Sequence, residues 1–223
     1  MTLIVGLVAT AALATGGASV ADEVKQKNRA LQPCRNLTSF IAQHGEISNN
    51  PRGTPGVAII GDSYTAGDVL VDRTDAWSYS IGGTLAGIGS TGFVSGGYCG
   101  DSAFTARIGA VVATKPDVLL IQGGLNDTGS SVDDIAHAVK ILSEASCAVP
   151  TVFIIGPVDA LAREGVPAVD SALSEAATRA GIKYISAIGW PVEFGPDNLH
   201  LTPAGHIDFA ARVRAETGIG QPL

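Results

Sequence analysis

Four short apolar runs, each followed within two residues by glycine, limit the fold of this chain more than any other feature. They are residues 57–60, 118–121, 152–155 and 184–188. Continuous runs rich in β-branched residues are typical of strands that are buried on both faces, as in parallel sheets. Helical spacing of apolar residues between these runs predicts right-handed βαβ units and a doubly wound sheet.

Three segments carry the predicted helices. Residues 132–146 and 166–180 place apolar side chains on one face, and a last helix is expected to begin with an N-cap and a proline at Thr202-Pro203. The apolar faces are expected to contain Ile135, Val139 and Leu142 in the first helix, Val169, Leu173 and Ala177 in the second, and Ile207, Ala210, Ala211 and Val213 in the last.

The composition fits one soluble domain with a full core, because the chain has 223 residues and only 16% of them are charged. The formal net charge is −7, and the basic residues form no concentrated cluster, so nucleic acid is not expected as a partner. Cys34, Cys99 and Cys147 are too few for a disulfide scaffold or a zinc knuckle, although they allow one disulfide and an odd thiol. No metal or cofactor is expected, because no cluster of histidine and acidic residues has ligand spacing.

The first 21 residues differ from the rest, because they are uncharged and apolar and end in small residues before Asp22. This pattern predicts a secretory signal peptide, with an uncleaved anchor or an ordinary buried segment as alternatives, since no basic residue precedes the apolar stretch. We therefore expect a secreted or envelope-associated protein, or a cytoplasmic one if the segment is no signal. Residues 22–54 are interpreted as an N-terminal extension and residues 55–223 as the main domain.

The first polar cluster at a strand end is Gly61-Asp62-Ser63. A serine at this place has its hydroxyl at the carboxyl edge of the sheet, where doubly wound folds bind ligands. The alternative is that Asp62 or Ser63 only caps a helix. The nucleophile elbow of α/β-hydrolases is excluded, because Thr65 stands where that motif needs a second glycine.

Two further clusters follow. Gly124-Leu125-Asn126-Asp127 comes after the second run, and its Asn126 offers a neutral donor for a developing oxyanion, although Asp127 and its neighbours are also ordinary turn residues. Asp197 stands three residues before His200, a spacing that lets a carboxylate orient the imidazole as a base. Three clusters in this order predict a serine nucleophile with a histidine base.

On these three blocks, residues 55–217 resemble the SGNH (GDSL-type) hydrolase superfamily. The resemblance implies a three-layer α/β/α sandwich with a flavodoxin-like parallel sheet of about five strands. It also implies Ser63 as the nucleophile, His200 as the base and Asp197 as its orienting residue. The implied oxyanion hole consists of the Ser63 N–H, Asn126 and a glycine, for which Gly89 is favoured over Gly96 and Gly97.

Residues 87–92 also match the Gly-x-Gly-x-x-Gly pattern of dinucleotide sites. That interpretation is rejected for two reasons: residues 81–86 are not expected to form a strand, and Arg107 stands about where an acidic residue is required. Cys99 and His206 are interpreted as structural residues, and Trp190 as packing near the site, where it could line an acyl pocket.

The function expected from the sequence is a serine esterase that acts on esters of small or medium acyl groups through an acyl-enzyme. The expected partner is then its substrate, a small-molecule ester. The N-terminal segment could in addition associate the protein with the cell envelope. An acyltransferase on the same fold, or a silent envelope protein that binds without turnover, are the alternatives.

Overall fold

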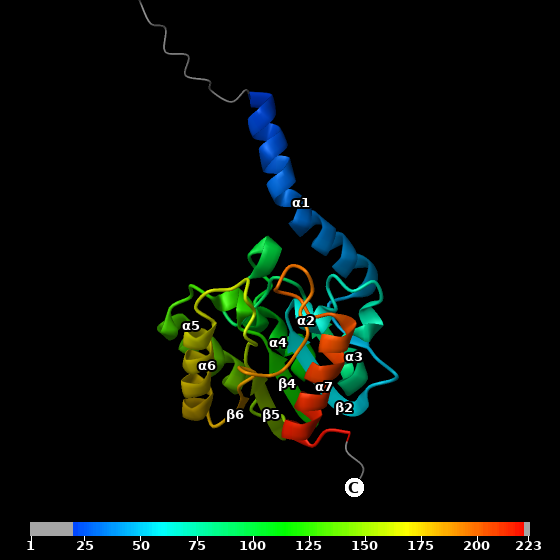
Figure 1. Cartoon of the computed structure of the whole chain (residues 1–223), viewed down its shortest axis with the longest axis vertical. Helices are drawn as coiled ribbons and strands as arrows, with labels where there is room; N and C mark the ends of the chain where they lie inside the picture. Colours follow the sequence, from blue (N-terminus) through cyan, green and yellow to red (C-terminus); the bar gives the residue numbers. More distant parts are fainter. Residues whose placement is uncertain (1–19, 221–223) are drawn as a thin grey trace, which may run out of the picture.

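A computed structural model describes residues 20–220 of the chain, and within them a six-stranded sheet forms the centre of the molecule (Figure 1). The spatial order is β1-β3-β2-β4-β5-β6, and every neighbouring pair is parallel except β1 with β3. The strands are β1 (Ser48–Asn49), β2 (Thr54–Gly61), β3 (Gly82–Gly87), β4 (Val118–Gln122), β5 (Thr151–Ile155) and β6 (Lys183–Ile185). The five parallel strands follow the flavodoxin-like order, which confirms the predicted fold class.

Helices cover both faces of the sheet, so the molecule has three layers. Alternate β2 residues divide between two cores: Val57 and Ile59 pack with α3 (Trp77–Ile81) and α7 (Pro203–Thr217), whereas Ala58 and Ile60 pack with the helices of the other face. Those helices are α4 (Phe104–Val112), α5 (Val132–Ala145) and α6 (Val166–Ala180). Shorter elements are α2 (Ser63–Ala66), η1 (Arg73–Asp75), η2 (Gly97–Cys99) and η3 (Leu125–Asp127).

One prediction is wrong: residues 81–86 are not expected to form a strand, but β3 spans Gly82–Gly87. The strand begins with two glycines that its neighbours require. A Cβ at Gly82 would lie 2.7 Å from Ile59 Cγ1, and one at Gly83 would lie 2.8 Å from the Thr54 carbonyl oxygen. Close packing against β2 therefore selects residues without side chains, which removes the apolar pattern by which strands are recognised.

The predicted helix faces are confirmed in α5 and α6 and are partly wrong in α7. Ile207, expected in the core, is 69% exposed, and Ala211 is exposed as well. The buried α7 side chains are instead His206, Phe209, Ala210 and Val213, spaced by three or four residues. The apolar stripe therefore includes a histidine, which is why apolar residues alone predict the wrong rotation of this helix.

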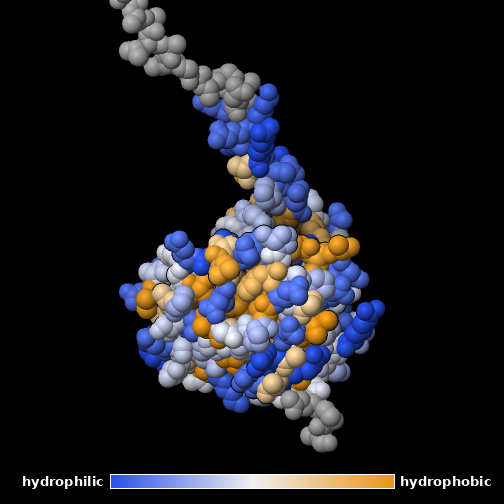
Figure 2. Space-filling model, viewed as in Figure 1, coloured by the Kyte–Doolittle hydropathy of each residue, from blue (hydrophilic) through white to orange (hydrophobic). Residues whose placement is uncertain are grey.

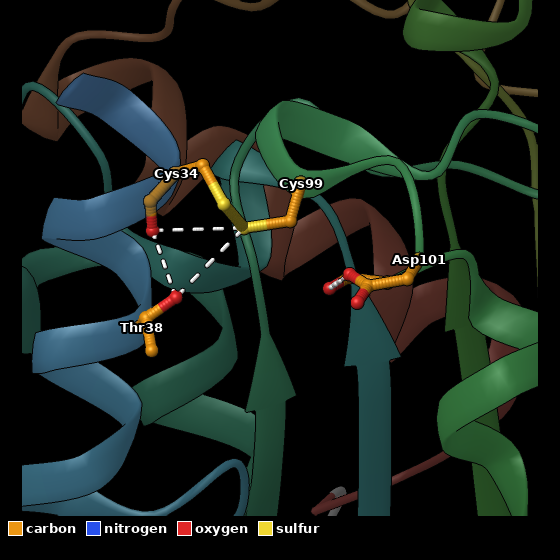
Figure 3. The surroundings of a disulfide bond; sticks show 5 residues. Cys34, Thr38, Cys99 and Asp101 are labelled. Atoms are coloured by element: carbon orange, nitrogen blue, oxygen red, sulfur yellow. Dashed lines mark hydrogen bonds between the residues drawn. A yellow bond between two sulfur atoms is a disulfide. The ribbon is translucent and has the colours of Figure 1, made fainter. Parts of the chain in front are cut away.

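The extension before the domain forms α1 (Val20–His44), a helix with Pro33 in its interior that projects from the upper side of the molecule (Figure 1). A disulfide between Cys34 and Cys99 joins this helix to η2 (Figure 3). The predicted signal peptide or anchor lies outside the described residues except for its last two. Among the helices of residues 20–220, none is long and apolar enough to cross a membrane.

Candidate active site

Ser63 lies directly after β2, at the carboxyl edge of the sheet beside the point where the strand order reverses. It opens α2, a single turn that Asp62 caps by accepting a hydrogen bond from the Tyr64 N–H at 2.9 Å. Both sequence interpretations of this cluster therefore fit: Asp62 is the cap, and Ser63 is free to face the cavity. Complete burial raises the pKa of Asp62 to about 7, partly offset by hydrogen bonds from Tyr64 and Gln122.

The loop before α7 places Asp197 against His200. The Asp197 Oδ2 atom lies 2.7 Å from His200 Nδ1, and its Oδ1 accepts the His200 N–H at 2.9 Å and the Leu199 N–H at 3.0 Å. The hydrogen bond to the His200 ring, then that to its N–H, lowers the pKa of Asp197 to about 2. Asn198 has a φ of 52° in the tight turn between the two, a conformation that asparagine tolerates. The carboxylate therefore orients the imidazole, with Nε2 left for another partner.

Tyr64 connects the turn that carries Ser63 to the loop that carries His200, a role that the sequence does not reveal. Its side chain is buried beneath the site, and its hydroxyl donates a hydrogen bond to the Leu199 carbonyl oxygen, next to His200. Burial, followed by repulsion from Asp62, raises the pKa of this phenol, so it remains a donor. The histidine loop is thereby held to the element that carries Ser63.

Asn126 and Gly89 both lie beside Ser63. Asn126, in η3 after β4, donates one amide hydrogen to the Thr91 carbonyl oxygen at 2.9 Å, which leaves its second amide hydrogen for a ligand. A Cβ built on Gly89 would lie 3.8 Å from Ser63 Cβ and 2.0 Å from Asp68 Oδ2, so a larger residue here would require the Asp68 side chain to move. Within residues 20–220, the Gly89 N–H donates to no backbone carbonyl.

Two buried charged residues hold the loop that carries Gly89. Arg107 donates to the Ala86 carbonyl oxygen at 2.6 Å, to the Gly61 carbonyl oxygen at 3.2 Å and to Thr91 Oγ1 at 3.1 Å, and burial lowers its pKa to about 10. Asp127 accepts the backbone N–H groups of residues 93–95 at 2.9 to 3.0 Å. In the sequence, only the position of Asp127 within the block Gly124-Leu125-Asn126-Asp127 indicates that it matters for the site. No motif in the sequence indicates a role for Arg107.

A cavity of about 330 Å³ contains three of the predicted residues, Ser63, Asn126 and His200. Its other lining residues are Asp68, Val69, Ser90, Tyr98, Leu125, Arg163 and Leu199. Ser63 and His200 make no direct hydrogen bond in the described part of the chain, although both line this cavity. This arrangement can deliver a hydroxyl to a carbonyl carbon with a base and oxyanion donors at hand.

Other histidine and tryptophan residues are placed outside this cavity. His206 is buried, its Nδ1 accepts the backbone N–H of Trp77 at 3.3 Å, and burial lowers its pKa to about 4. Trp190 packs on Phe209 with ring centroids 5.1 Å apart, which agrees with packing near the site and not with lining the cavity. Among residues 20–220, no group of three His, Cys, Asp or Glu side chains could hold a metal ion.

The glycine pattern at residues 87–92 does not form a dinucleotide-binding site in this fold. It does follow a strand, contrary to expectation, but the chain continues through a loop, and the next α-helix begins only at Phe104. A dinucleotide site needs a helix that starts at the glycines.

A doubly wound sheet with a serine, an amide and a carboxylate-bound histidine at one edge defines the SGNH class of serine hydrolases. A family model described as GDSL-like Lipase/Acylhydrolase matches residues 59–206, more than half of the chain, and the protein belongs to this family. Among curated proteins, none matches the sequence.

Solved structures agree with this fold. Est24, a carbohydrate acetylesterase from Sinorhizobium meliloti, is 16% identical with a TM-score of 0.61, and the match covers 73% of this chain and 97% of that one. Axe2, an acetylxylan esterase from Geobacillus stearothermophilus, is 16% identical with a TM-score of 0.57, over 75% and 96% of the two chains. At these identities the likeness supports the architecture alone.

Proposed function

We propose that the protein hydrolyses carboxylic esters of small or medium acyl groups through an acyl-enzyme on Ser63. The observation that carries this proposal is the shared cavity of Ser63, Asn126 and His200, with Asp197 bound to the imidazole at 2.7 Å. Membership of an acylhydrolase family supports the reaction class.

In the proposed mechanism, Ser63 Oγ attacks the ester carbonyl carbon while His200 Nε2 takes its proton. The N–H groups of Ser63 and Gly89 and the amide of Asn126 stabilise the oxyanion. Collapse of the tetrahedral intermediate expels the alcohol, to which His200 returns the proton. Water, activated by the same histidine, then releases the acid from the acyl-enzyme.

Chromogenic ester turnover by the wild type and by Ser63→Ala tests the proposal. We expect Ser63→Ala to lower kcat by on the order of 10³-fold or more with an unchanged thermal unfolding midpoint. An organophosphonate should label Ser63 in the wild type only. Label at another residue, or undiminished turnover by the variant, would contradict the assignment.

A second arm of the same assay adds a sugar or lipid alcohol as acceptor. Hydrolysis requires that the acid accumulates at the rate at which the chromogenic alcohol is released. Accumulation of a new ester in place of the acid would identify an acyltransferase, and binding of esters without turnover would identify a silent envelope protein.

We also propose that the protein is exported. The Cys34–Cys99 disulfide supports this, because such bonds persist mainly in oxidising compartments, and the apolar segment of residues 1–21 has the pattern of a secretory signal. Expression of the full chain, cell fractionation and sequencing of the mature N-terminus test the proposal. Recovery of an uncleaved, reduced protein in the cytoplasm would contradict it.

A further inference from the structure

A second cavity, of about 710 Å³, adjoins the cavity of Ser63 and His200, and apart from Gly89 its lining residues have no role in the mechanism proposed above. One wall is the C-terminal half of α1, and the other is formed by Ala66 and by the segment 87–89 at the end of β3. Its volume is within the range of cavities that bind small molecules. In Figure 2, hydrophobic residues gather at the surface where α1 meets the body, whereas the projecting part of this helix is hydrophilic.

The α1 wall is one face of the helix. The lining positions 29, 32, 33, 36, 37, 40 and 41 follow the three- and four-residue spacing of a single helical stripe. Arg29, Gln32 and Asn36 are polar, whereas the last turn is apolar with Leu37, Phe40 and Ile41. Glu46, just after the helix, adds one carboxylate to this wall. Ile88 and Tyr98 contribute apolar surface from the opposite side.

The two cavities adjoin beside Ser63. Asp68 and Tyr98 line both of them. Gly89, placed above as an oxyanion donor, lines the larger cavity, and a Cβ at this glycine would lie 3.8 Å from Ser63 Cβ. A group attached to the reacting carbonyl can therefore extend from Ser63 past Gly89 towards α1.

Specific contacts keep the two walls in place. The disulfide ties Cys34 of α1 to Cys99, the neighbour of Tyr98, so it joins the two sides of the cavity (Figure 3). Arg73 stacks over the Phe40 ring at 4.9 Å and pairs with Asp68 at 3.2 Å, which neutralises the carboxylate at the junction. The helix is thus positioned as a wall of the cavity.

We propose that this second cavity, between α1 and the segment 87–89, binds the acyl chain of a medium-chain ester. The inference rests on the proposed function and names its substrate class. An acyl chain fits because the apolar stripe offers hydrocarbon a contact away from water, and the charged group at the junction is already paired. A sugar would find hydrogen-bond partners at the polar lining positions, such as Gln32, Asn36 and Glu46, but its hydroxyl groups would lose water without replacement over Leu37, Phe40 and Ile41.

The test is a series of p-nitrophenyl esters from acetate to decanoate. For the wild type, kcat/KM should increase about fourfold for each methylene that enters the cavity, the factor expected from burial of a CH₂ group. Leu37→Trp fills the cavity and should lower the decanoate-to-acetate ratio of kcat/KM at least tenfold. Ser39→Trp adds an indole of the same size outside the lining face, and its ratio should equal that of the wild type.

A second variant covers the case in which Leu37→Trp does not fold. The double substitution Cys34→Ser with Cys99→Ser releases the tie between the walls, and it should also lower the decanoate-to-acetate ratio, with a correctly folded domain shown by its near-UV circular dichroism. A ratio that is the same in the wild type, in Leu37→Trp and in the double variant would overturn the acyl-chain assignment. The proposed function survives that result if turnover still depends on Ser63, and it fails if no ester is hydrolysed or if Ser63→Ala remains active.

Discussion

At the scale of single residues, the two amide hydrogens of Asn126 have different partners in the proposed mechanism. One amide hydrogen is bound to the Thr91 carbonyl oxygen, which fixes the orientation of the amide, and we propose that the other donates to the oxyanion. A donor that is fixed in advance of the reaction stabilises developing charge without reorganisation. The contact with Thr91 therefore positions the donor.

Asn126→Ala removes this donor while keeping Ser63 and His200. We expect kcat for an activated ester to fall by roughly 10²–10³, with a modest change in KM, because the lost contact forms only as charge develops. Steady-state kinetics measure both constants, and thermal unfolding checks that the Thr91 loop is retained. An increase in KM alone would instead make Asn126 a substrate-binding residue.

Asp197 and His200 form a pair whose effect appears in the pH dependence of the rate. Asp197, with a pKa of about 2, stays charged throughout the pH range of the assay, and in the proposed mechanism it stabilises the imidazolium that forms during attack. In Asp197→Asn, the acidic limb of kcat/KM should move to lower pH and the plateau should fall. His200→Ala should be about as damaging as Ser63→Ala, because the two act as a unit.

The pH–rate profiles of both variants decide this assignment. An acidic limb that does not move in Asp197→Asn, together with appreciable activity in His200→Ala, would show that another group is the base. His206 does not fit that role in the structure, since it is buried and its Nδ1 is bound to the Trp77 N–H.

At the scale of elements, the sequence predicts the parts of the site that follow strong strands. β2 and β4 are apolar runs, so the polar residues that follow them are expected at one edge of the sheet from periodicity and spacing alone. β3 could not be recognised, because its glycines are required by contacts with β2. The Gly89 loop is therefore placed by resemblance and not by periodicity.

Tyr64 and Arg107, which hold the loops of the site in place, could not be predicted for a different reason. The contact from Tyr64 to Leu199 spans 135 residues, and that from Arg107 to Gly61 spans 46. Their roles depend on which loops the fold brings together, and no local pattern encodes this. The same applies to α1, because the interpretation of its residues as an extension says nothing about a cavity that they line.

The hydrogen bonds of Arg107 to β2 and β3 allow a prediction about stability. Arg107→Met removes the buried, charge-assisted hydrogen bonds to the carbonyl oxygens of Ala86 and Gly61, and each bond of this kind contributes about 1.5–3 kcal/mol. The Gly61 carbonyl oxygen keeps the Ile88 N–H at 3.1 Å, so the expected loss is at the lower part of the summed range. We expect the free energy of unfolding to fall by about 2 to 5 kcal/mol in urea denaturation. Arg179→Met, which removes an exposed pair with Glu175 on α6, should change it by less than about 1 kcal/mol. Equal losses in both variants would contradict the bridging role.

At the scale of the whole molecule, two buried groups make stability depend on pH in opposite directions. The pKa of Asp62 is raised to about 7 from its ordinary 3.8, and that of His206 is lowered to about 4 from 6.5. The Asp62 contribution is fully present below about pH 4 and is lost as the pH rises towards 7. The His206 contribution is present above pH 6.5 and is lost as the pH falls towards 4.

Substituting Asp62 separates the two contributions. Asp62→Asn retains a helix cap but cannot ionise, so it removes the loss of stability that the wild type suffers on the alkaline side. The difference in free energy of unfolding, variant minus wild type, should increase by on the order of 2 to 4 kcal/mol between about pH 4 and pH 7.5. His206→Asn keeps an acceptor for the backbone N–H of Trp77. The free energy of unfolding of this variant minus that of the wild type should increase as the pH falls from about 7 to 4. Urea unfolding at several pH values across this range measures both differences. Parallel stability curves for the wild type and Asp62→Asn would show that the aspartate beside the nucleophile is already ionised in the folded protein at the acidic end of the range.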